Sequence, residues 1–495
     1  MNNALFLKRP LMFVGTGSDV GKSVISAAFC RIFKQDGFHP APFKAQNMSL
    51  NSFATPEGLE IGRAQAVQAE ACDIPCSVDM NPVLLKPSGN LNAQVVMNGK
   101  PIGTQSASEY FTSKGREQLF NHVMQSYERL ANKYSPVVME GAGSISELNL
   151  KDRDITNMRV ALKTNAATFL IADIDRGGIF GSIYGTVQLL PPEERKLLKG
   201  IIINKFRGDS KLFESGKKQL EELTGIPVVS ILPWFSDIHI EQEDSVVLKT
   251  KKNESEEGKI NVAVVLLRHM SNFTDFDVLE RTPGIHLYYA AKPSDLDAAD
   301  IMIIPGSKNT ISDMQYLRDK GMAKRILKQH DAGKAVYGIC GGYQIMGKTI
   351  YDPDQVEGDI SVIPGLGLLP VETTLSPEKT TEQCSFSFLN NEKNGKGYEI
   401  HMGNTRRTGG KPLCHVDTGE EDGCFLDSKT WGTYIHGILD NPFIISQILK
   451  ANGKACQKQE FNYAAYKQEQ YDKLSKLVRR HTDIDYIYKT LIQKQ

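Results

Sequence analysis

A cysteine and a histidine in this sequence have the setting of a nucleophile and its base. Cys340 follows the apolar run 335–339, and glycines stand on both sides of it. This pattern predicts a strand, a sharp turn and a helix, a geometry that exposes a nucleophile at a sheet edge and lets backbone N–H groups hold an oxyanion. His436 is the candidate base. A buried structural cysteine is the alternative, but it would not need an open glycine turn.

A second set of residues has the order of a phosphate-binding loop. The apolar run 11–14 precedes the loop, and a helical pattern from 24 to 33 follows it. Backbone N–H groups and a helix start would then face phosphate groups, with Lys22 at the β- and γ-phosphates of ATP and Ser23 at Mg²⁺. A glycine-rich turn without a nucleotide is the alternative. The loop comprises Gly15, Thr16, Gly17, Ser18, Asp19, Val20, Gly21, Lys22 and Ser23.

The order of strands and helices predicts an α/β protein with two doubly wound domains. A chain of 495 residues is too long for one core. We expect a P-loop domain over 1–235, a linker over 236–259, a second domain over 260–445 and a helical tail over 446–495. Charged residues without apolar periodicity mark the linker, and strands that end in polar residues suit an open parallel sheet.

The composition excludes several classes of protein. Lys+Arg and Asp+Glu are both 58, so nothing indicates a nucleic acid or an anionic membrane as partner. No apolar run reaches the roughly 20 residues that span a bilayer, and we see no signal peptide. The 8 cysteines do not form a disulfide scaffold, so we expect reduced thiols and a cytoplasmic protein. Nothing in the sequence indicates an oligomeric state.

The stretch from Gly338 to Gln344 resembles the nucleophile elbow of the class I glutamine amidotransferases. This resemblance implies that Cys340 hydrolyses glutamine through a thioester and that His436 is its base. Most members carry a glutamate two residues after the histidine, where this chain has Ile438. We therefore expect that a backbone carbonyl, a hydroxyl or water orients His436, or that the imidazole is oriented only when glutamine binds. We also expect a slow basal glutaminase that rises when ATP and the acceptor are bound.

The same resemblance implies an oxyanion site and a choice between two histidines. In the family, N–H groups from two loops hold the oxyanion, which makes Gly306 and Gly341 the candidates here. His401 lies in 397–403, a run that resembles the family's segment near the glutamine pocket. We prefer His436 as base, because its place near the C-terminal end of the domain matches the family.

The first domain resembles the dethiobiotin synthetase-like branch of P-loop proteins, because Thr16 stands where the common loop pattern has glycine. The resemblance implies Glu140, after the apolar run 137–139, as a Mg²⁺ ligand. Glu60 is a second candidate, for which an exposed acid at a helix start is an equally good interpretation. The resemblance further places Lys44 near the transferred phosphate and Asn204 at the nucleotide base.

Three amide-rich runs, 42–52, 62–70 and 80–87, resemble the cobyric acid synthase family. Amides can hydrogen-bond carboxylates and carboxamides, although a solvated helix face is the alternative for Gln65 and Gln68. The family implies amidation of the b, d, e and g carboxylates of the corrinoid adenosylcobyrinic acid a,c-diamide, with ATP, Mg²⁺ and glutamine. The alternatives are a cobyrinic acid a,c-diamide synthase and a P-loop regulatory ATPase with an inactive amidotransferase domain.

Overall fold

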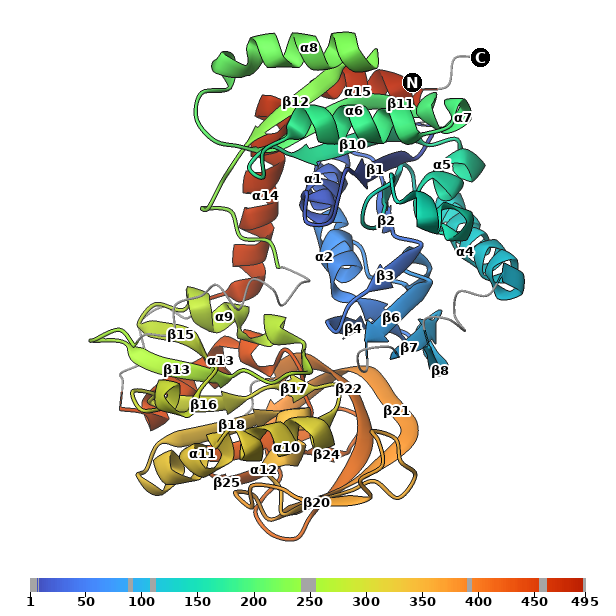
Figure 1. Ribbon diagram of the computed structural model, residues 1–495. Helices are drawn as coiled ribbons and strands as arrows, with labels where there is room; N and C mark the ends of the chain where they lie inside the picture. Colours follow the sequence, from blue (N-terminus) through green and yellow to red (C-terminus); the bar gives the residue numbers. More distant parts are fainter. Residues whose placement is uncertain are drawn as a thin grey trace. The chain divides into compact units, whose positions relative to one another are not determined.

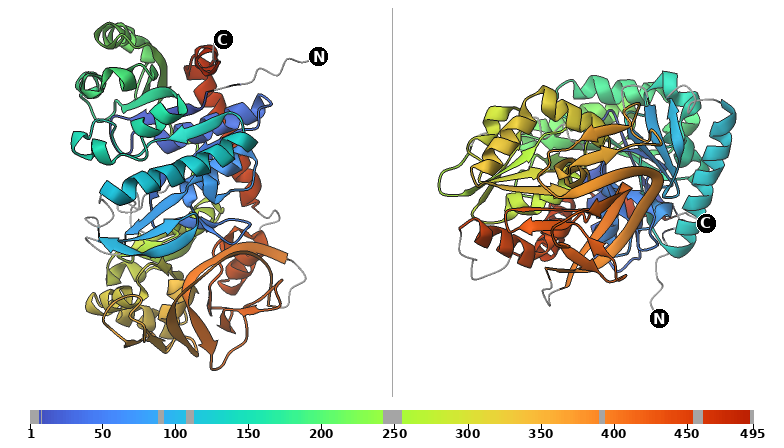
Figure 2. Two further views of the ribbon diagram at one scale, coloured as in Figure 1. Left: turned by 90° about the vertical axis from the view of Figure 1, so that its right-hand side faces the viewer. Right: turned by 90° about the horizontal axis from the view of Figure 1, so that it is seen from below.

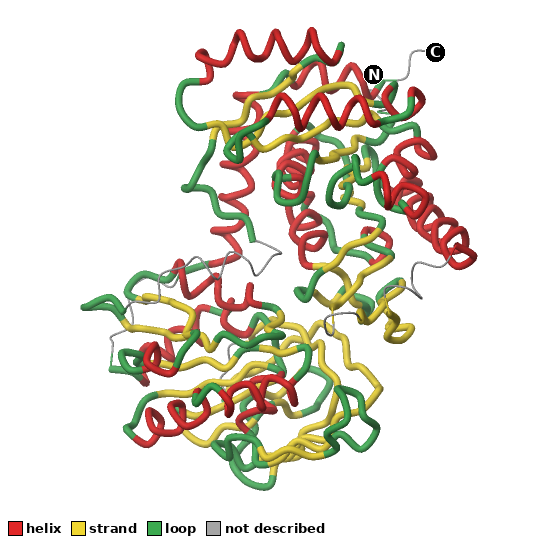
Figure 3. The backbone as a smooth tube through the Cα atoms, viewed as in Figure 1, coloured by secondary structure: helices red, strands yellow, loops and turns green. Residues whose placement is uncertain are grey.

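The structure is a computed structural model, which describes residues 7, 9–87, 92–106, 113–241, 255–389, 394–453 and 461–492. Its helices and strands fall into two compact units (Figure 3). The first unit comprises 1–48, 61–241 and 466–495, and the second comprises 49–60 and 242–465. Of the expected linker, residues 242–254 lie outside the described residues.

The first unit is built on a parallel six-stranded sheet with the order β12-β11-β10-β1-β9-β2 (Figure 1). Its strands are runs of buried apolar residues, as expected where helices cover both faces of a sheet. The strands are β1 (Leu11–Gly15), β2 (Ala41–Phe43), β9 (Val137–Glu140), β10 (Ala167–Asp173), β11 (Leu198–Phe206) and β12 (Val228–Pro233). The helices are α1 (Lys22–Gln35), α2 (Arg63–Cys72), α4 (Ser113–Lys133), α5 (Met158–Thr164), α6 (Ile179–Leu189), α7 (Pro192–Arg195) and α8 (Glu214–Thr224).

A smaller sheet and the C-terminal helices complete the first unit. The small sheet has the order β3-β6-β7-β8, with β3 (Gln46–Met48), β6 (Val83–Pro87), β7 (Asn92–Met97) and β8 (Lys100–Ser106). Helices α14 (Tyr463–His481) and α15 (Ile484–Leu491) bury Leu474, Val478 and Leu491 in the same core as Phe13 and Phe29. The residues that we assigned to a C-terminal tail from 466 onward therefore belong to the core of the first unit.

The second unit contains another six-stranded sheet, with the order β15-β13-β16-β18-β26-β25. All neighbours are parallel except β25 and β26. The strands are β13 (Ile260–Val265), β15 (Ile285–Ala290), β16 (Ile301–Ile304), β18 (Ala335–Ile339), β25 (Cys424–Asp427) and β26 (Thr430–Thr433). Its helices are α9 (Asp277–Arg281), α10 (Thr310–Asp319), α11 (Met322–Asp331), α12 (Gly341–Met346) and α13 (Pro442–Ala451). Two α/β sheets of the expected class are thus present.

A long antiparallel hairpin, β21 (Val371–Phe388) and β22 (Asn394–Arg407), forms a second sheet of this unit and curls strongly, as the orange ribbon in Figure 2 shows. Strands β19 (Thr349–Tyr351), β20 (Val362–Pro364), β23 (Cys414–Val416) and β24 (Glu421–Asp422) extend this sheet. Short strands β14 (Met270–Ser271) and β17 (Gly306–Ser307) pair with each other. The segment 49–60 also belongs to this unit and contains β4 (Ser52–Ala54), while the unit boundary falls within β5 (Glu60–Gly62). Among the described residues, no helix is long and apolar enough to cross a membrane.

Candidate active site

Cys340 occupies a strained turn between strand β18 and helix α12. Its backbone has φ 52° and ψ −111°, a conformation that costs a non-glycine residue free energy and that recurs at functional sites. The glycines after it are required by space: a Cβ on Gly342 would lie 1.9 Å from the carbonyl oxygen of Ile304. The predicted strand, turn and helix are therefore all present.

His436 follows strand β26 and is almost completely buried. Its Nδ1 lies 2.7 Å from Oδ2 of Asp275, and the other carboxylate oxygen of Asp275 accepts a hydrogen bond from the N–H of Gly437 at 3.0 Å. The ring of Tyr398 stacks on the imidazole, with the ring centroids 5.3 Å apart. The imidazole thus has a fixed orientation.

The expectation that no carboxylate orients His436 is wrong. The acid comes from the short 3-10 helix η5 (Phe273–Phe276), far from the position after the histidine that Ile438 occupies. Sequence reasoning missed Asp275, because we looked for the acid only at the family's usual spacing. One signal was present in the sequence: Asp275 stands between Phe273 and Phe276. An acid among aromatic residues is a candidate for burial, and a buried charge needs a partner.

The charges around His436 favour the imidazolium. Burial alone would lower the pKa of His436, but the Asp275 carboxylate and a hydrogen-bonded contact with Cys340 outweigh it and raise the pKa to about 10. This shift favours the protonated ring at neutral pH. An imidazolium beside a cysteine stabilises the thiolate, which is the nucleophilic form of the side chain.

Gly306 and Gly341, the two oxyanion candidates, lie close to these side chains. A Cβ built on Gly306 would lie 3.3 Å from Cε1 of His436, and one on Gly341 would lie 2.7 Å from the N–H nitrogen of Ser307. Since α12 begins at Gly341, the N–H groups of its first turn have no partner within the helix. The strand pair β14–β17 and the elbow thus bring Gly306 close to His436 and Gly341 close to Ser307, the residue after Gly306.

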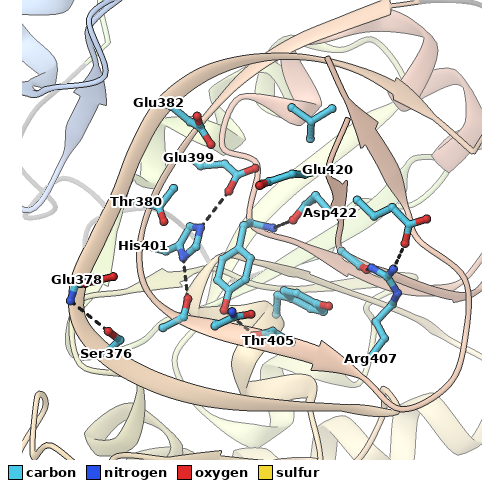
Figure 4. A pocket seen from close by; sticks show the side chains of 17 residues that line it. Ser376, Glu378, Thr380, Glu382, Glu399, His401, Thr405, Arg407, Glu420 and Asp422 are labelled. Atoms are coloured by element: carbon cyan, nitrogen blue, oxygen red, sulfur yellow. Dashed lines mark hydrogen bonds and ion pairs between the residues drawn. The ribbon is translucent and has the colours of Figure 1, made fainter. Parts of the chain in front are cut away.

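His401 lies on the other face of β22 from the residues that contact Cys340 and His436. Ile400, whose carbonyl oxygen accepts the Cys340 thiol at 3.6 Å, and Tyr398 alternate with Glu399 and His401 along the strand. His401 instead pairs with Glu399 at 2.9 Å and lines a cavity of about 350 Å³ inside the curled hairpin (Figure 4). This alternation separates His401 from the nucleophile.

The predicted phosphate loop of the first unit lies between β1 and α1. Lys22 donates hydrogen bonds to the carbonyl oxygens of Gly17 at 2.8 Å and Gly143 at 2.9 Å. Burial lowers its pKa to about 8, against the opposing effect of the Glu140 carboxylate. Asn204 donates to the carbonyl oxygen of Val20 at 2.8 Å, so this side chain braces the loop. Its contact with the nucleotide base stays a prediction.

Glu140 joins the phosphate loop to residues from two other elements. One carboxylate oxygen accepts hydrogen bonds from Ser23 at 2.8 Å and Lys44 at 2.9 Å, and the other accepts from Gln68 at 2.7 Å. Burial would raise the pKa of Glu140, but the charge of Lys44 and these hydrogen bonds hold it below its usual value. The carboxylate is therefore ionised in the resting site.

The amides of α2 are part of this site. Gln65 and Gln68 are 0% and 1% exposed, so the solvated helix face that we left open is wrong for both. Gln65 accepts a hydrogen bond from Asn47 at 3.1 Å. The contact between Gln68 and Glu140 was not predicted from the sequence, because an amide-rich run has no hydrophobic periodicity that distinguishes buried from solvated positions.

Glu60, the second metal candidate, belongs to the other unit. Its carboxylate forms a buried ion pair with Lys379 of strand β21. The interpretation as an exposed acid at a helix start is wrong, because Glu60 is 1% exposed. Ser23 and Glu140 are thus the candidate metal residues that the structure brings into contact.

Both units contain stretches that match known protein families. The family described as "CobQ/CobB/MinD/ParA nucleotide binding domain" matches residues 11–246, and "CobB/CobQ-like glutamine amidotransferase domain" matches 261–443. Proteins named cobyric acid synthase are 58% identical in Parabacteroides distasonis, over 98% of this chain and 99% of the relative. In Salmonella arizonae the identity is 44%, over 99% of both chains. The chain belongs to the cobyric acid synthase family.

Proposed function

We propose that this protein amidates the b, d, e and g carboxylates of adenosylcobyrinic acid a,c-diamide, with ATP as activating agent and glutamine as nitrogen source. The observation that carries the proposal is the hydrogen-bonded series Asp275–His436–Cys340 in a chain that also has a complete phosphate loop. A glutaminase and a nucleotide site in one chain are what an ATP-dependent amidation requires.

In the second unit, the thiolate of Cys340 attacks the carboxamide carbon of glutamine. As the C–N bond breaks, His436 gives its proton to the leaving nitrogen, and ammonia is released. The N–H groups of Gly306 and Gly341 are the proposed donors to the oxyanion. Water then attacks the thioester with His436 as base, which frees glutamate. Asp275 holds the imidazole in the orientation that both proton transfers need.

In the first unit, a carboxylate oxygen of the acceptor attacks the γ-phosphorus of ATP. The bond to the bridging oxygen breaks, ADP leaves, and an acyl phosphate is formed. Ammonia then attacks the acyl carbon, and phosphate leaves. Activation is needed because an oxygen of a free carboxylate is a poor leaving group. The proposed role of Lys22 is to hold the β- and γ-phosphates. Lys44, which lies beside the same carboxylate as Ser23, is the proposed contact of the transferred phosphoryl group.

Ser23 and Glu140 fit a magnesium ion. Their oxygens lie 2.8 Å apart, and Mg²⁺ prefers one or two protein oxygens together with phosphate oxygens. When bound, the ion would neutralise charge on the transferred phosphate. Glu60 is not included in this site, because Lys379 holds its carboxylate. We further propose a cytoplasmic location, where the thiol of Cys340 stays reduced.

The test is incubation of the protein with the a,c-diamide, ATP and glutamine, with the product mass read over time. Four successive replacements of a hydroxyl by an amino group are expected. If cobyrinic acid is amidated and the a,c-diamide is not, the protein is an a,c-diamide synthase. If glutamine is not hydrolysed under any condition, the amidotransferase domain is inactive.

A further inference from the structure

The segment Ser49–Glu60 comes from the nucleotide-binding half of the sequence but belongs to the glutaminase unit. It lies inside residues 11–246, which match the nucleotide-binding family. The chain before it, through β3, and after it, from Ile61 through α2, belongs to the first unit. Helix α2 carries Gln68, which holds Glu140. A short segment, called here the 49–60 segment, thus continues at both of its ends into the first unit.

The 49–60 segment is firmly packed against the hairpin β21–β22. Ala54 is fully buried, and its carbonyl oxygen accepts a hydrogen bond from Gln383 at 2.8 Å. Phe53 packs edge-on against Tyr398, with ring centroids 4.5 Å apart. The buried pair of Glu60 and Lys379 fixes the end of the segment. These contacts hold the backbone of the segment beside the strand that carries Tyr398.

Asn51 and Ser52 exchange hydrogen bonds with the turn that carries Asp275. The side chain of Asn51 accepts from the N–H of Phe273 at 3.2 Å, and the N–H of Ser52 donates to the side chain of Asn272 at 2.9 Å. Asn272 has a left-handed backbone, φ 51°, and begins η5. The exchange therefore fixes the turn that directs Asp275 toward His436.

Ser52 also contacts Tyr398, whose ring stacks on the imidazole. The hydroxyl of Tyr398 donates to the carbonyl oxygen of Ser52 at 3.4 Å, and its ring stacks on His436. The backbones of Tyr398 and His436 also exchange two hydrogen bonds, at 2.8 and 3.1 Å. Residues 51 and 52 thus hold the turn that carries Asp275, and Ser52 also holds the ring that stacks on His436.

We propose that the 49–60 segment is a working part of the glutaminase, in which Asn51 is a positioning residue for the Asp275–His436 pair. The nucleotide-binding half of the chain thereby supplies a residue on which ammonia release depends. The inference rests on the proposed glutaminase, but it needs neither the corrinoid nor ATP turnover to be tested.

The test measures glutamate release by the full chain with Asn51→Ala. We expect kcat to fall about tenfold, which corresponds to about 1.4 kcal/mol. KM for glutamine should stay within about twofold, because Asn51 acts on the orientation of the imidazole and not on the binding of glutamine. The alkaline limb of the pH profile should move to lower pH, since a less well placed carboxylate supports the imidazolium less. Glu57→Ala, an exposed change in the same segment, is the matched control and should match the parent.

A double-mutant cycle distinguishes positioning from general damage. Asn272→Gly keeps the left-handed turn but removes the acceptor for Ser52, so it should give the same loss of kcat. Combined with Asn51→Ala, it should cost little more than either change alone, because both break one exchange. An unchanged kcat in Asn51→Ala, or full additivity, overturns the proposal. So does an equal loss of ammonia-dependent amidation, which would assign the segment to the stability of the whole chain. Failure of the parent to amidate the a,c-diamide would reject the proposed substrate and leave the glutamate-release assay intact.

Discussion

The thiol site and the phosphate site hold their charged groups in opposite ways. At the thiol site, Asp275, His436 and Cys340 already contact one another in the order that proton transfer needs. At the phosphate site, the lysine side chains are paired with other groups of the protein. Lys22 donates to two backbone carbonyls, and Lys44 pairs with Glu140. One site is ready for its substrate, and the other must exchange contacts when its ligand arrives.

The difference follows from the charge of the two ligands. Glutamine brings a neutral carboxamide to the nucleophile, so the charged pair can be complete beforehand. ATP brings several negative charges, and cations buried without partners would be costly in its absence. The hydrogen bonds of Lys22 to carbonyl oxygens offset that cost. Phosphate oxygens can replace these carbonyl oxygens when ATP binds. Changes at the thiol site should therefore affect chemistry, and changes at the phosphate site should affect both binding and chemistry.

The largest expected effect separates the two sites completely. Cys340→Ala should lower glutamine-dependent amidation at least about 10⁴-fold, because no other group can form the thioester. Amidation with a high concentration of ammonium at mildly basic pH should survive, since the nucleotide site is in the other unit. Product mass with each nitrogen source is the measurement. Loss of both activities in a folded variant would contradict the assignment of two sites.

A change in the phosphate loop should lower amidation with either nitrogen source. Lys22→Ala removes a positive charge where the β- and γ-phosphates must be held, and we expect a loss of about 10²- to 10³-fold. Glutamate release without ATP should stay at the level of the parent, because Cys340 and its partners are unchanged. Unchanged ATP-dependent turnover would show that nucleotide binds elsewhere.

Removal of the charge on Asp275 should damage the thiol site without changing glutamine binding. Asp275→Asn should lower the kcat of glutamate release about 100-fold, because the imidazole loses its fixed tautomer and its charge partner. Asp275 raises the pKa of His436, so the variant has a lower pKa. The imidazolium exists below that pKa, and the alkaline loss of activity should therefore begin at lower pH than in the parent.

The control for this change is Asp277→Asn, two residues further along the chain at the start of α9. It should keep both the rate and the alkaline limb of the pH profile. A similar shift in the two variants would mean that the net charge of the turn, rather than the contact of Asp275 with His436, sets the pKa.

The two sites also differ in how far the sequence predicts them. The phosphate loop is contiguous, and strand, loop and helix are determined by neighbouring residues, so residues 15–23 could be placed from the sequence. The turn at Cys340 is likewise formed by neighbouring residues, so it could also be predicted from the sequence. Asp275 reaches His436 only because the sheet brings η5 and the end of β26 together. A contact between residues so far apart in the sequence has no fixed sequence spacing from which it could be predicted.

The same limit explains the domain boundaries. Residues 446–495 were expected to form a helical tail, and the core of the first unit contains Leu474 and Val478 of that stretch. The helical pattern did not indicate which of the two units these residues would pack against. Likewise, nothing local distinguishes the 49–60 segment from the runs before and after it, although it belongs to the other unit. Which unit a segment joins depends on surfaces that are distant in sequence.

The smallest expected effect concerns the amides that support the phosphate site. Gln68→Leu removes the hydrogen bond to Glu140 while keeping a side chain of similar size, so the pKa of Glu140 should rise. The carboxylate is ionised only above that pKa. The acid limb of ATP-dependent amidation should therefore move to higher pH. Activity at neutral pH should fall about tenfold, the lower end of the range for a lost contact to a metal ligand.

Gln65→Leu is the matched control, because Gln65 is buried in the same helix and bonds Asn47. It should lower activity less and leave the acid limb unchanged. The amount of Mg²⁺ needed for half-maximal amidation should rise only in the Gln68 variant, since Gln68 holds the carboxylate proposed to bind the ion. An equal shift of the acid limb in both variants would contradict a particular effect of Gln68 on Glu140. The shift would then come from the loss of a buried polar group in α2 that the fold of the site requires.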